Sequence, residues 1–95
     1  MPLIEVLDRI KKHDIDALKI RRVLEEYERL SVYANDYISK GDIAVLVLYY
    51  HFPQKDKVHE DVDVLIGFYM ETAERMPMDD KRRLIDLIFD YLDHK

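Results

Sequence analysis

The chain has 95 residues, of which 48% are hydrophobic and 37% are charged, and its formal net charge is −5 at pH 7. This length predicts one domain over residues 1–95, and the apolar content excludes an intrinsically disordered chain. Cysteine is absent, which excludes disulfides, thiolate metal sites and a cysteine nucleophile. Because there is no apolar run of about 18 residues and no basic start of a signal peptide, we expect a soluble cytoplasmic protein without a membrane partner.

Two amphipathic helices are predicted in the N-terminal part of the chain. The first carries apolar side chains at helical spacing, at Leu3, Ile4, Leu7 and Ile10. After an interruption at residues 11–14, Asp14 or Asp16 can cap the second helix, and one bent helix is the alternative because no proline or glycine enforces a break. The apolar stripe of the second helix comprises Leu18, Ile20, Val23, Leu24, Tyr27, Leu30, Ser31, Ala34, Tyr37 and Ile38. Gly41 follows where a helix commonly ends in a left-handed residue, so this helix is predicted to end at Lys40.

The next segment, residues 43–50, has no polar side chain except two phenols. Asp42 is a candidate helix cap before it, and Pro53 follows it. Valine, isoleucine and tyrosine also favour strands, so a hairpin with residues 62–70 in an α+β fold is the alternative. We favour a helix because residues 62–70 have a helical pattern and would leave such a strand without a partner. A helix that is apolar on every face must be enclosed, either at the centre of the domain or between two chains.

Two further helices are predicted in the C-terminal half. The fourth has a stripe formed by Val58, Val62, Leu65, Ile66, Tyr69, Met70 and Ala73, and it ends before Pro77. The fifth follows Asp79 or Asp80 as a cap and contains Leu84, Ile85, Leu87, Ile88, Phe89, Tyr91 and Leu92. The sequence therefore predicts an all-α fold, a bundle of four to five helices with one fully buried central helix.

The predicted helices have more apolar surface than one small bundle can bury. The third helix is apolar all round, the fifth is apolar around most of its circumference, and Val64 and Phe68 lie beside the main stripe of the fourth. We therefore expect a homodimer formed through the fifth helix with Val64 and Phe68, and a compact monomer is the alternative. With Phe89 and Tyr33, these residues form the predicted interaction surface. Seven tyrosines suit such a surface, although core packing explains them too.

No motif in the chain indicates catalysis or cofactor binding. A glycine-rich phosphate loop, a nucleophile elbow and a His-Glu-x-x-His pattern are all missing, so we expect no enzyme and no cofactor. His59 and Asp63 share a helix face at a spacing of four residues and could hold half of a metal site. We expect them instead to be ordinary surface residues near the start of a helix.

Charge is distributed unevenly along the chain. Residues 1–40 carry eight basic and eight acidic side chains, whereas residues 41–95 carry seven basic and twelve acidic ones. This acidic excess argues against nucleic-acid binding. The fifth helix has an evenly spaced acidic strip made of Asp79, Asp86, Asp90 and Asp93. Such a strip either mimics the phosphates of DNA or simply faces solvent.

The segment Leu24–Ser31, with Gly41 and a second apolar helix after it, resembles uncharacterised small helical proteins of phage and bacterial genomes. In those proteins a leucine–aromatic–glutamate helix precedes a glycine turn, and the helix between Glu28 and Gly41 is longer here. The resemblance implies a helical fold and a phage or mobile-element origin. It implies no activity and no functional residue.

Surplus apolar and tyrosine-rich surface, without a constellation for chemistry, indicates a small non-enzymatic interaction or regulatory protein. We expect it to act by binding a protein partner. One alternative is an acidic DNA-mimic inhibitor of a nucleic-acid-binding protein. The other is a metal-binding helical protein that uses His59 and Asp63.

Overall fold

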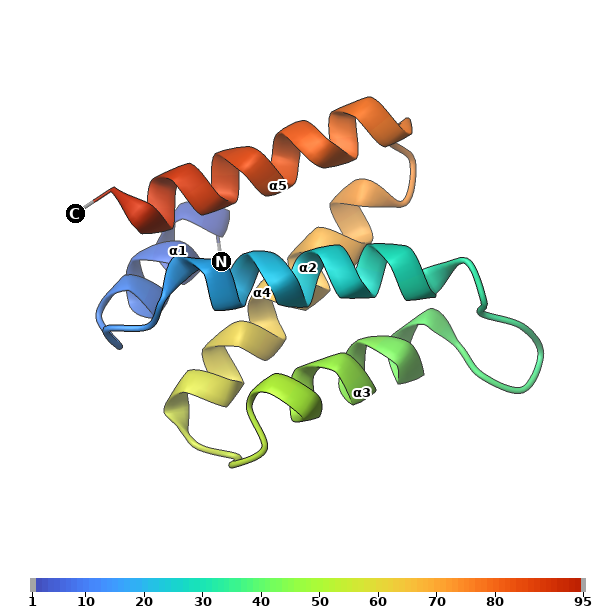
Figure 1. Cartoon of the computed structure of the whole chain (residues 1–95), viewed down its shortest axis with the longest axis horizontal. Coiled ribbons are helices and arrows are strands. Elements are labelled where there is room, and N and C mark those ends of the chain that lie inside the picture. Colours follow the sequence, from blue (N-terminus) through green and yellow to red (C-terminus); the bar gives the residue numbers. More distant parts are fainter. Residues whose placement is uncertain (1, 95) are drawn as a thin grey trace.

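The computed structural model describes residues 2–94 and contains five α-helices in that range (Figure 1). They are α1 (Leu3–Lys11), α2 (Ala17–Ser31), α3 (Lys40–His51), α4 (Lys57–Ala73) and α5 (Met78–Asp93). No strand occurs among the described residues, so the predicted all-α fold is confirmed and the α+β alternative is excluded.

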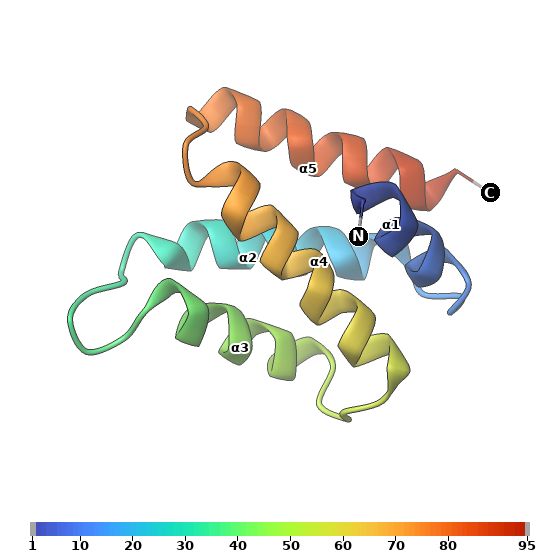
Figure 2. The same ribbon diagram turned by 180° about the vertical axis from the view of Figure 1, so that it is seen from behind.

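Helix α2 is the central element of the arrangement. It lies between α5 and α3, and α4 crosses it on the far side in Figure 1. The view from behind in Figure 2 shows α4 running obliquely across α2, with α1 beside the C-terminal part of α5. The packing agrees with these views, because α2 contacts α3 and α5 extensively and α1 contacts α4 and α5.

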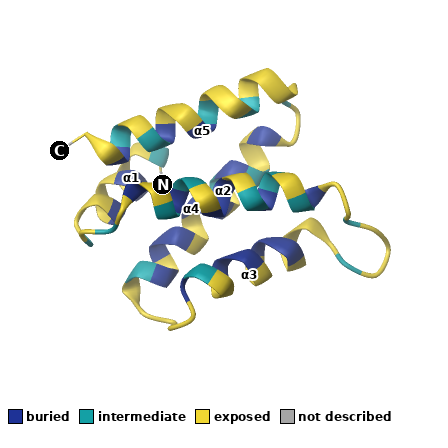
Figure 3. Cartoon of the chain, viewed as in Figure 1, coloured by how far each residue is buried: buried dark blue, intermediate teal, exposed yellow. Residues whose placement is uncertain are grey.

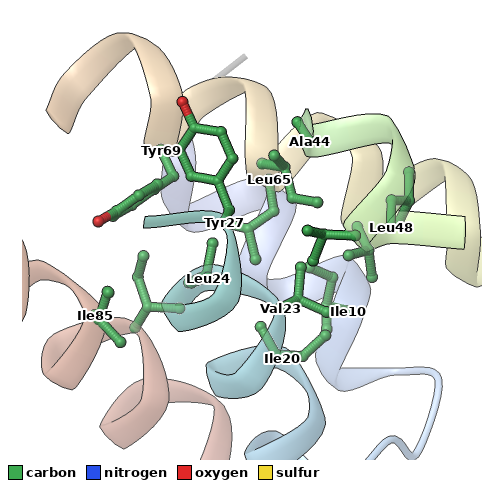
Figure 4. Close-up of a cluster of buried hydrophobic side chains, with 14 of the residues drawn as sticks. Ile10, Ile20, Val23, Leu24, Tyr27, Ala44, Leu48, Leu65, Tyr69 and Ile85 are labelled. Carbon is green, nitrogen blue, oxygen red and sulfur yellow. The ribbon is translucent and has the colours of Figure 1, made fainter. Parts of the chain in front are cut away.

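All five helices contribute side chains to one buried apolar cluster (Figure 3). The most enclosed side chains belong to α2 and α4, where Val23, Leu24, Val62 and Leu65 have no exposed surface. Figure 4 shows residues of α2 surrounded by side chains from the other helices. Burying one such side chain stabilises a fold by about 1.5–3 kcal/mol, so this shared cluster is the main reason why the helices assemble.

Side-chain caps determine where three of the helices begin. Asp16 and Asp56 each accept a hydrogen bond of 3.0 Å from a backbone N–H in the first turn of α2 and α4. At α3 the Ser39 hydroxyl accepts a bond from the Asp42 N–H (3.0 Å), and the Asp42 carboxylate accepts one from the Ser39 N–H (2.9 Å). These caps satisfy N–H groups that have no partner inside a helix.

The second helix is shorter than predicted, because it ends at Ser31 rather than at Lys40. Asn35 explains the difference. Its side-chain oxygen accepts hydrogen bonds from the backbone N–H groups of Tyr37 (2.7 Å) and Ile38 (3.1 Å). This local turn competes with helical hydrogen bonding, so the apolar pattern over residues 32–38 belongs to a loop.

The predicted roles of Gly41 and Asp42 are also wrong. Gly41 lies in the first turn of α3, and no described glycine has a positive φ. Asp42 is the third residue of that helix, and Ser39 is its cap. The left-handed residue of the described chain is instead Asp14, with φ of 54°, in the turn that separates α1 from α2. Aspartate tolerates this conformation better than most residues, which explains how the chain turns there without glycine.

Prolines, rather than acidic caps, precede the first and last helices. Pro2 and Pro77 occupy the cap positions of α1 and α5 and make no side-chain hydrogen bond there. Asp79 and Asp80, which were predicted to cap the fifth helix, lie inside its first turn. Their carboxylates stabilise α5 through the positive end of the helix dipole instead.

The prediction of a fully buried central helix is wrong for α3. Ile43, Ala44, Val47 and Leu48 are buried, but Leu46 on the other side of the helix is 62% exposed. Helix α3 packs against α2 and α4 on one side only. With so few helices in the fold, no neighbour remains to cover its second side.

Candidate interaction surface

The outer side of α3 carries four large apolar side chains that are all at least 40% exposed. Val45, Leu46, Tyr49 and Tyr50 are 48%, 62%, 40% and 79% exposed. They recur at steps of three and four residues, which places them along one side of the helix, opposite its buried side chains. Figure 3 shows buried and exposed positions following one another along α3. We call these four residues the α3 apolar face.

The α3 apolar face is also free of charge, since residues 43–50 contain no acidic or basic side chain. The exposed sides of other helices do carry acids, for example Asp8 on α1, Asp63 on α4 and Asp90 on α5. Few charges and many tyrosines distinguish the centres of protein–protein interfaces from ordinary surface. The composition of this face is therefore typical of a contact surface.

An apolar groove of about 340 Å³ lies beside the α3 apolar face. It is lined by Leu30, Tyr33, Ile38, Ile43, Leu46 and Val47. The groove forms where the chain leaves α2, passes through the turn around Asn35 and returns as α3. Tyr33 at this site is 69% exposed. We call this feature the α2–α3 groove, and its lining suits an apolar side chain of another molecule.

The residues predicted to form the interaction surface lie on three different elements. Tyr33 lines the α2–α3 groove, in the loop after α2. Val64 on α4 is 40% exposed, whereas Phe68 on the same helix is half-buried against the core. Phe89 on α5 is half-buried, and the guanidinium carbon of Arg21 lies 4.4 Å from the centre of its ring.

Sequence reasoning missed most of the α3 apolar face because it treated the whole segment as enclosed. Helical spacing alone separates the segment into two stripes, one with Val47 and Leu48 and one with Leu46 and Tyr50. The five helices of residues 2–94 leave a helix at the periphery of the fold with neighbours on one side only. The small number of predicted helices was therefore the signal that one stripe of this helix stays exposed.

The two residues of the proposed metal pair, His59 and Asp63, differ in burial. His59, predicted at the surface, is only 3% exposed, and its Nδ1 lies 2.8 Å from the carbonyl oxygen of Phe52. The ring of Tyr49 packs against the His59 ring with 4.5 Å between their centres. Asp63 lies one turn further along α4 and is exposed. Within residues 2–94 no group of three or more potential ligands could hold a metal ion.

Two other histidines connect elements that are distant in the sequence. His13 Nε2 lies 2.6 Å from a carboxylate oxygen of Asp61, which is buried on α4 at 4% exposure. His51 at the end of α3 pairs with Glu26 of α2. Both pairs hold neighbouring helices together, so these side chains already have structural partners.

The acidic strip lies on the exposed side of α5. Asp79, Asp86, Asp90 and Asp93 are all exposed. Asp86 forms an ion pair with Arg21 of α2, so part of the strip is neutralised within the chain itself. The remaining acids face solvent, as on an ordinary helix surface.

A polar network lies between α2, α4 and α5. The hydroxyl of Tyr69, which is 1% exposed, donates a hydrogen bond of 2.8 Å to Glu28, and Lys81 Nζ lies 3.3 Å from the other carboxylate oxygen of Glu28. Burial raises the pKa of Tyr69, and the hydrogen bond to Glu28 raises it further. The ring of Tyr27 meets that of Tyr69 edge-on, at 6.0 Å between centres (Figure 4). Burial and the charges of Glu28 and Glu74 raise the pKa of Tyr27, so both phenols stay protonated near neutral pH.

Comparison with known protein families, with characterised proteins and with solved structures finds no match. Among the described residues, none of the helices combines the length and the apolar character needed to cross a membrane. Function is therefore inferred from the surface of the molecule itself.

Proposed function

We propose that this chain is a small, non-enzymatic interaction protein that binds another protein molecule through the α3 apolar face. The observation that supports this proposal is an uncharged helix side with four large exposed apolar residues next to an apolar groove. Apolar surface costs about 25 cal/mol per Å² when it stays in water, and monomeric proteins rarely keep large contiguous apolar patches. Covering this surface therefore supplies a driving force for association.

A helix of the partner suits the shape of this surface. Helix α3 has 12 residues and is about 18 Å long, and the α3 apolar face extends over about 8 Å of that length. Side chains spaced four residues apart, such as Val45 with Tyr49 and Leu46 with Tyr50, form ridges that pack into the grooves of a second helix. The α2–α3 groove then accepts an apolar side chain from that helix.

The partner that we propose is a second copy of the chain, which makes the protein a homodimer. Helix α3 itself presents an apolar stripe, and a twofold axis brings the same surface of two copies together. Each copy has a net charge of −5, so association through an acidic surface is opposed by repulsion. An interface through residues 43–50 brings no like charges of the two copies together, whereas an interface through the exposed side of α5 brings Asp90 and Asp93 of the two copies together. We therefore place the interface on α3 rather than on α5.

Light scattering coupled to size-exclusion chromatography tests the homodimer with a matched pair of variants. Leu46 on α3 and Leu87 on α5 are exposed leucines, at 62% and 66%. We expect the wild type and Leu87→Asp to elute with the mass of a dimer and Leu46→Asp to elute with the mass of a monomer. Because both variants add the same charge at an equally exposed site, a difference between them reports on the position of the interface.

Amide hydrogen exchange gives a second readout of the same surface. If two copies meet through α3, the amides of residues 43–50 become better protected as the protein concentration rises, and Leu46→Asp removes this dependence. A wild type that remains monomeric, with exchange independent of concentration, contradicts the homodimer. Loss of the dimer in Leu87→Asp alone moves the interface to α5.

A further inference from the structure

The α2–α3 groove lies toward the start of α3, and the most exposed tyrosine of the α3 apolar face lies toward its end. Ile43 and Leu46 are among the residues of α3 that line the groove. Tyr50 follows Leu46 by four residues, so both side chains lie on the same side of the helix, about 6 Å apart along its axis. Tyr49 is engaged with α4 instead, since its ring packs against the His59 ring. The groove and the Tyr50 ring are therefore presented to the same partner.

The groove has the size and the chemistry to accept an aromatic ring. Its volume is about 340 Å³, whereas a cavity of about 150 Å³ is enough to hold benzene. Its lining consists of aliphatic and aromatic side chains without a charged group. Tyr50 is 79% exposed, so one chain leaves its ring in water. Tyr50 does not belong to the lining of the groove in its own chain, so a Tyr50 ring in the groove comes from a second copy.

Twofold symmetry allows two directions for α3 against its copy. If both helices run in the same direction, Tyr50 meets Tyr50 of the second copy and the two grooves lie next to each other. If the helices run in opposite directions, with the twofold axis level with residue 48, Tyr50 of each copy lies opposite Leu46 of the other. Because Leu46 lines the groove, the antiparallel arrangement fills both grooves at once.

The charges beyond the two ends of α3 favour the same arrangement. Residues 36–42, around its start, carry two acids and one lysine, whereas residues 52–57, after its end, carry two lysines and one acid. All six of these side chains are exposed. An antiparallel pair brings the acidic start of one copy to the basic end of the other, and a parallel pair brings like ends together. Exposed charges add little affinity, but they select between two orientations.

We propose that two copies pack their α3 helices antiparallel and that each copy inserts the ring of Tyr50 into the α2–α3 groove of the other. This inference rests on the proposed homodimer and names the side chain that completes the groove. The ring packs against Leu30, Tyr33 and Ile38, with its hydroxyl at the open rim of the groove. The contact occurs twice in the dimer, so one substitution removes both copies of it.

Paramagnetic relaxation in mixed dimers measures the direction of the two helices. The chain has no cysteine, so Gln54→Cys gives one site for a nitroxide label just beyond the end of α3. The labelled variant is mixed with isotope-enriched wild type, and because only the wild type gives signals, any broadening reports contacts between copies. We expect the amide signals of the first turn of α3, residues 40–43, to broaden. Broadening of the last turn, residues 48–51, shows a parallel pair and overturns this arrangement while the homodimer stands.

Two substitutions of Tyr50 and one control test the ring itself. Tyr50→Ala removes it from both contacts and should raise the Kd of the dimer at least tenfold. Tyr50→Phe keeps the ring and should dimerise like the wild type. Leu87→Ala, at a position of α5 that is 66% exposed, should leave the Kd unchanged. Light scattering over a range of concentrations measures each Kd, and a wild-type Kd in Tyr50→Ala overturns the insertion.

A double-mutant cycle connects the ring to the groove. Tyr33 lines the groove and is 69% exposed, so Tyr33→Ala changes the groove without opening the core. If the Tyr50 ring packs there, Tyr33→Ala combined with Tyr50→Ala raises the Kd by less than the product of the two single effects. A rise equal to that product places the ring outside the groove and overturns the insertion. A monomeric wild type refutes the homodimer itself, and its mass shows this before any variant is compared.

Discussion

Helices α3 and α4 are both rich in apolar residues, but they are related to the core in different ways. Helix α4 has one apolar stripe, with Val62 and Leu65 completely buried and Asp63 facing solvent. Helix α3 has a buried stripe as well, and a second stripe around Leu46 that remains uncovered. The difference follows from the neighbours, because α4 packs against α1, α2 and α3, whereas α3 packs mainly against α2 and α4. The apolar content of a helix therefore sets how much surface it can bury, and its position in the fold sets how much it does bury.

The strongest test of this comparison substitutes one leucine in each helix. Leu65→Ala creates a cavity at a position with no exposed surface, and we expect it to lower the free energy of unfolding by about 2–5 kcal/mol. Leu46→Ala removes a side chain that is 62% exposed, and we expect a change within about 0.5 kcal/mol. Urea denaturation at protein concentrations where the chain is monomeric measures both. Equal losses in the two variants would mean that α3 is covered by the fold itself.

Helix α4 also differs from α3 in having a buried carboxylate with a hydrogen-bond partner on another element. Asp61 of α4 is buried, and His13 is its hydrogen-bond partner at 2.6 Å. His13→Ala leaves this carboxylate without that partner, and we expect a loss of about 2–3 kcal/mol in the free energy of unfolding. Replacing both residues by alanine should cost less than the sum of the two single changes, because the buried charge disappears. Strict additivity in this double-mutant cycle would exclude a direct interaction.

Helices with a single apolar stripe were predictable, because the spacing of their apolar residues shows which side is buried. In α4 the stripe through Val62, Leu65 and Tyr69 is buried as predicted. The end of α2 was not predictable from the stripe, since Tyr37 continues the helical spacing and is nevertheless 98% exposed in a loop. The turn around Asn35 and the capping box of Ser39 decide that boundary, and local hydrogen bonds of this kind have no apolar signature.

The candidate surfaces were harder to predict than the helices. A sequence pattern shows that residues 43–50 are apolar, but only the arrangement of α2 and α4 shows that Val47 is covered and Leu46 is not. The α2–α3 groove brings together Leu30 of α2, Ile38 of the loop and Ile43 of α3. Such a site depends on helix crossing, which no local pattern encodes.

The buried phenol of Tyr69 on α4 predicts how the free energy of unfolding depends on pH. Burial, followed by the hydrogen bond to Glu28, raises the pKa of Tyr69 above its ordinary value of about 10. The unfolded chain therefore loses this proton at a lower pH than the folded chain, so the contribution is complete below about pH 10 and declines as the pH rises further. Tyr69→Phe should cost about 1.5–2 kcal/mol at neutral pH and should flatten the alkaline decline. Urea denaturation at several pH values measures both effects, and an unchanged decline in Tyr69→Phe would assign it to other groups.

The smallest expected effects concern the residues that cap the first turns of α3 and α4. Ser39→Ala removes the cap of α3 and Asp56→Ala removes the cap of α4, and each should lower the free energy of unfolding by about 1 kcal/mol. Local unfolding of the first turn should be easier in α3 than in α4, because α4 packs against more helices. We expect faster amide hydrogen exchange in the first turn of α3 after Ser39→Ala, and a smaller change in α4 after Asp56→Ala. Asp36→Ala, an exposed substitution in the loop before α3, serves as the control. Equal exchange in the Ser39 and Asp36 variants would show that the capping box does not determine where α3 begins.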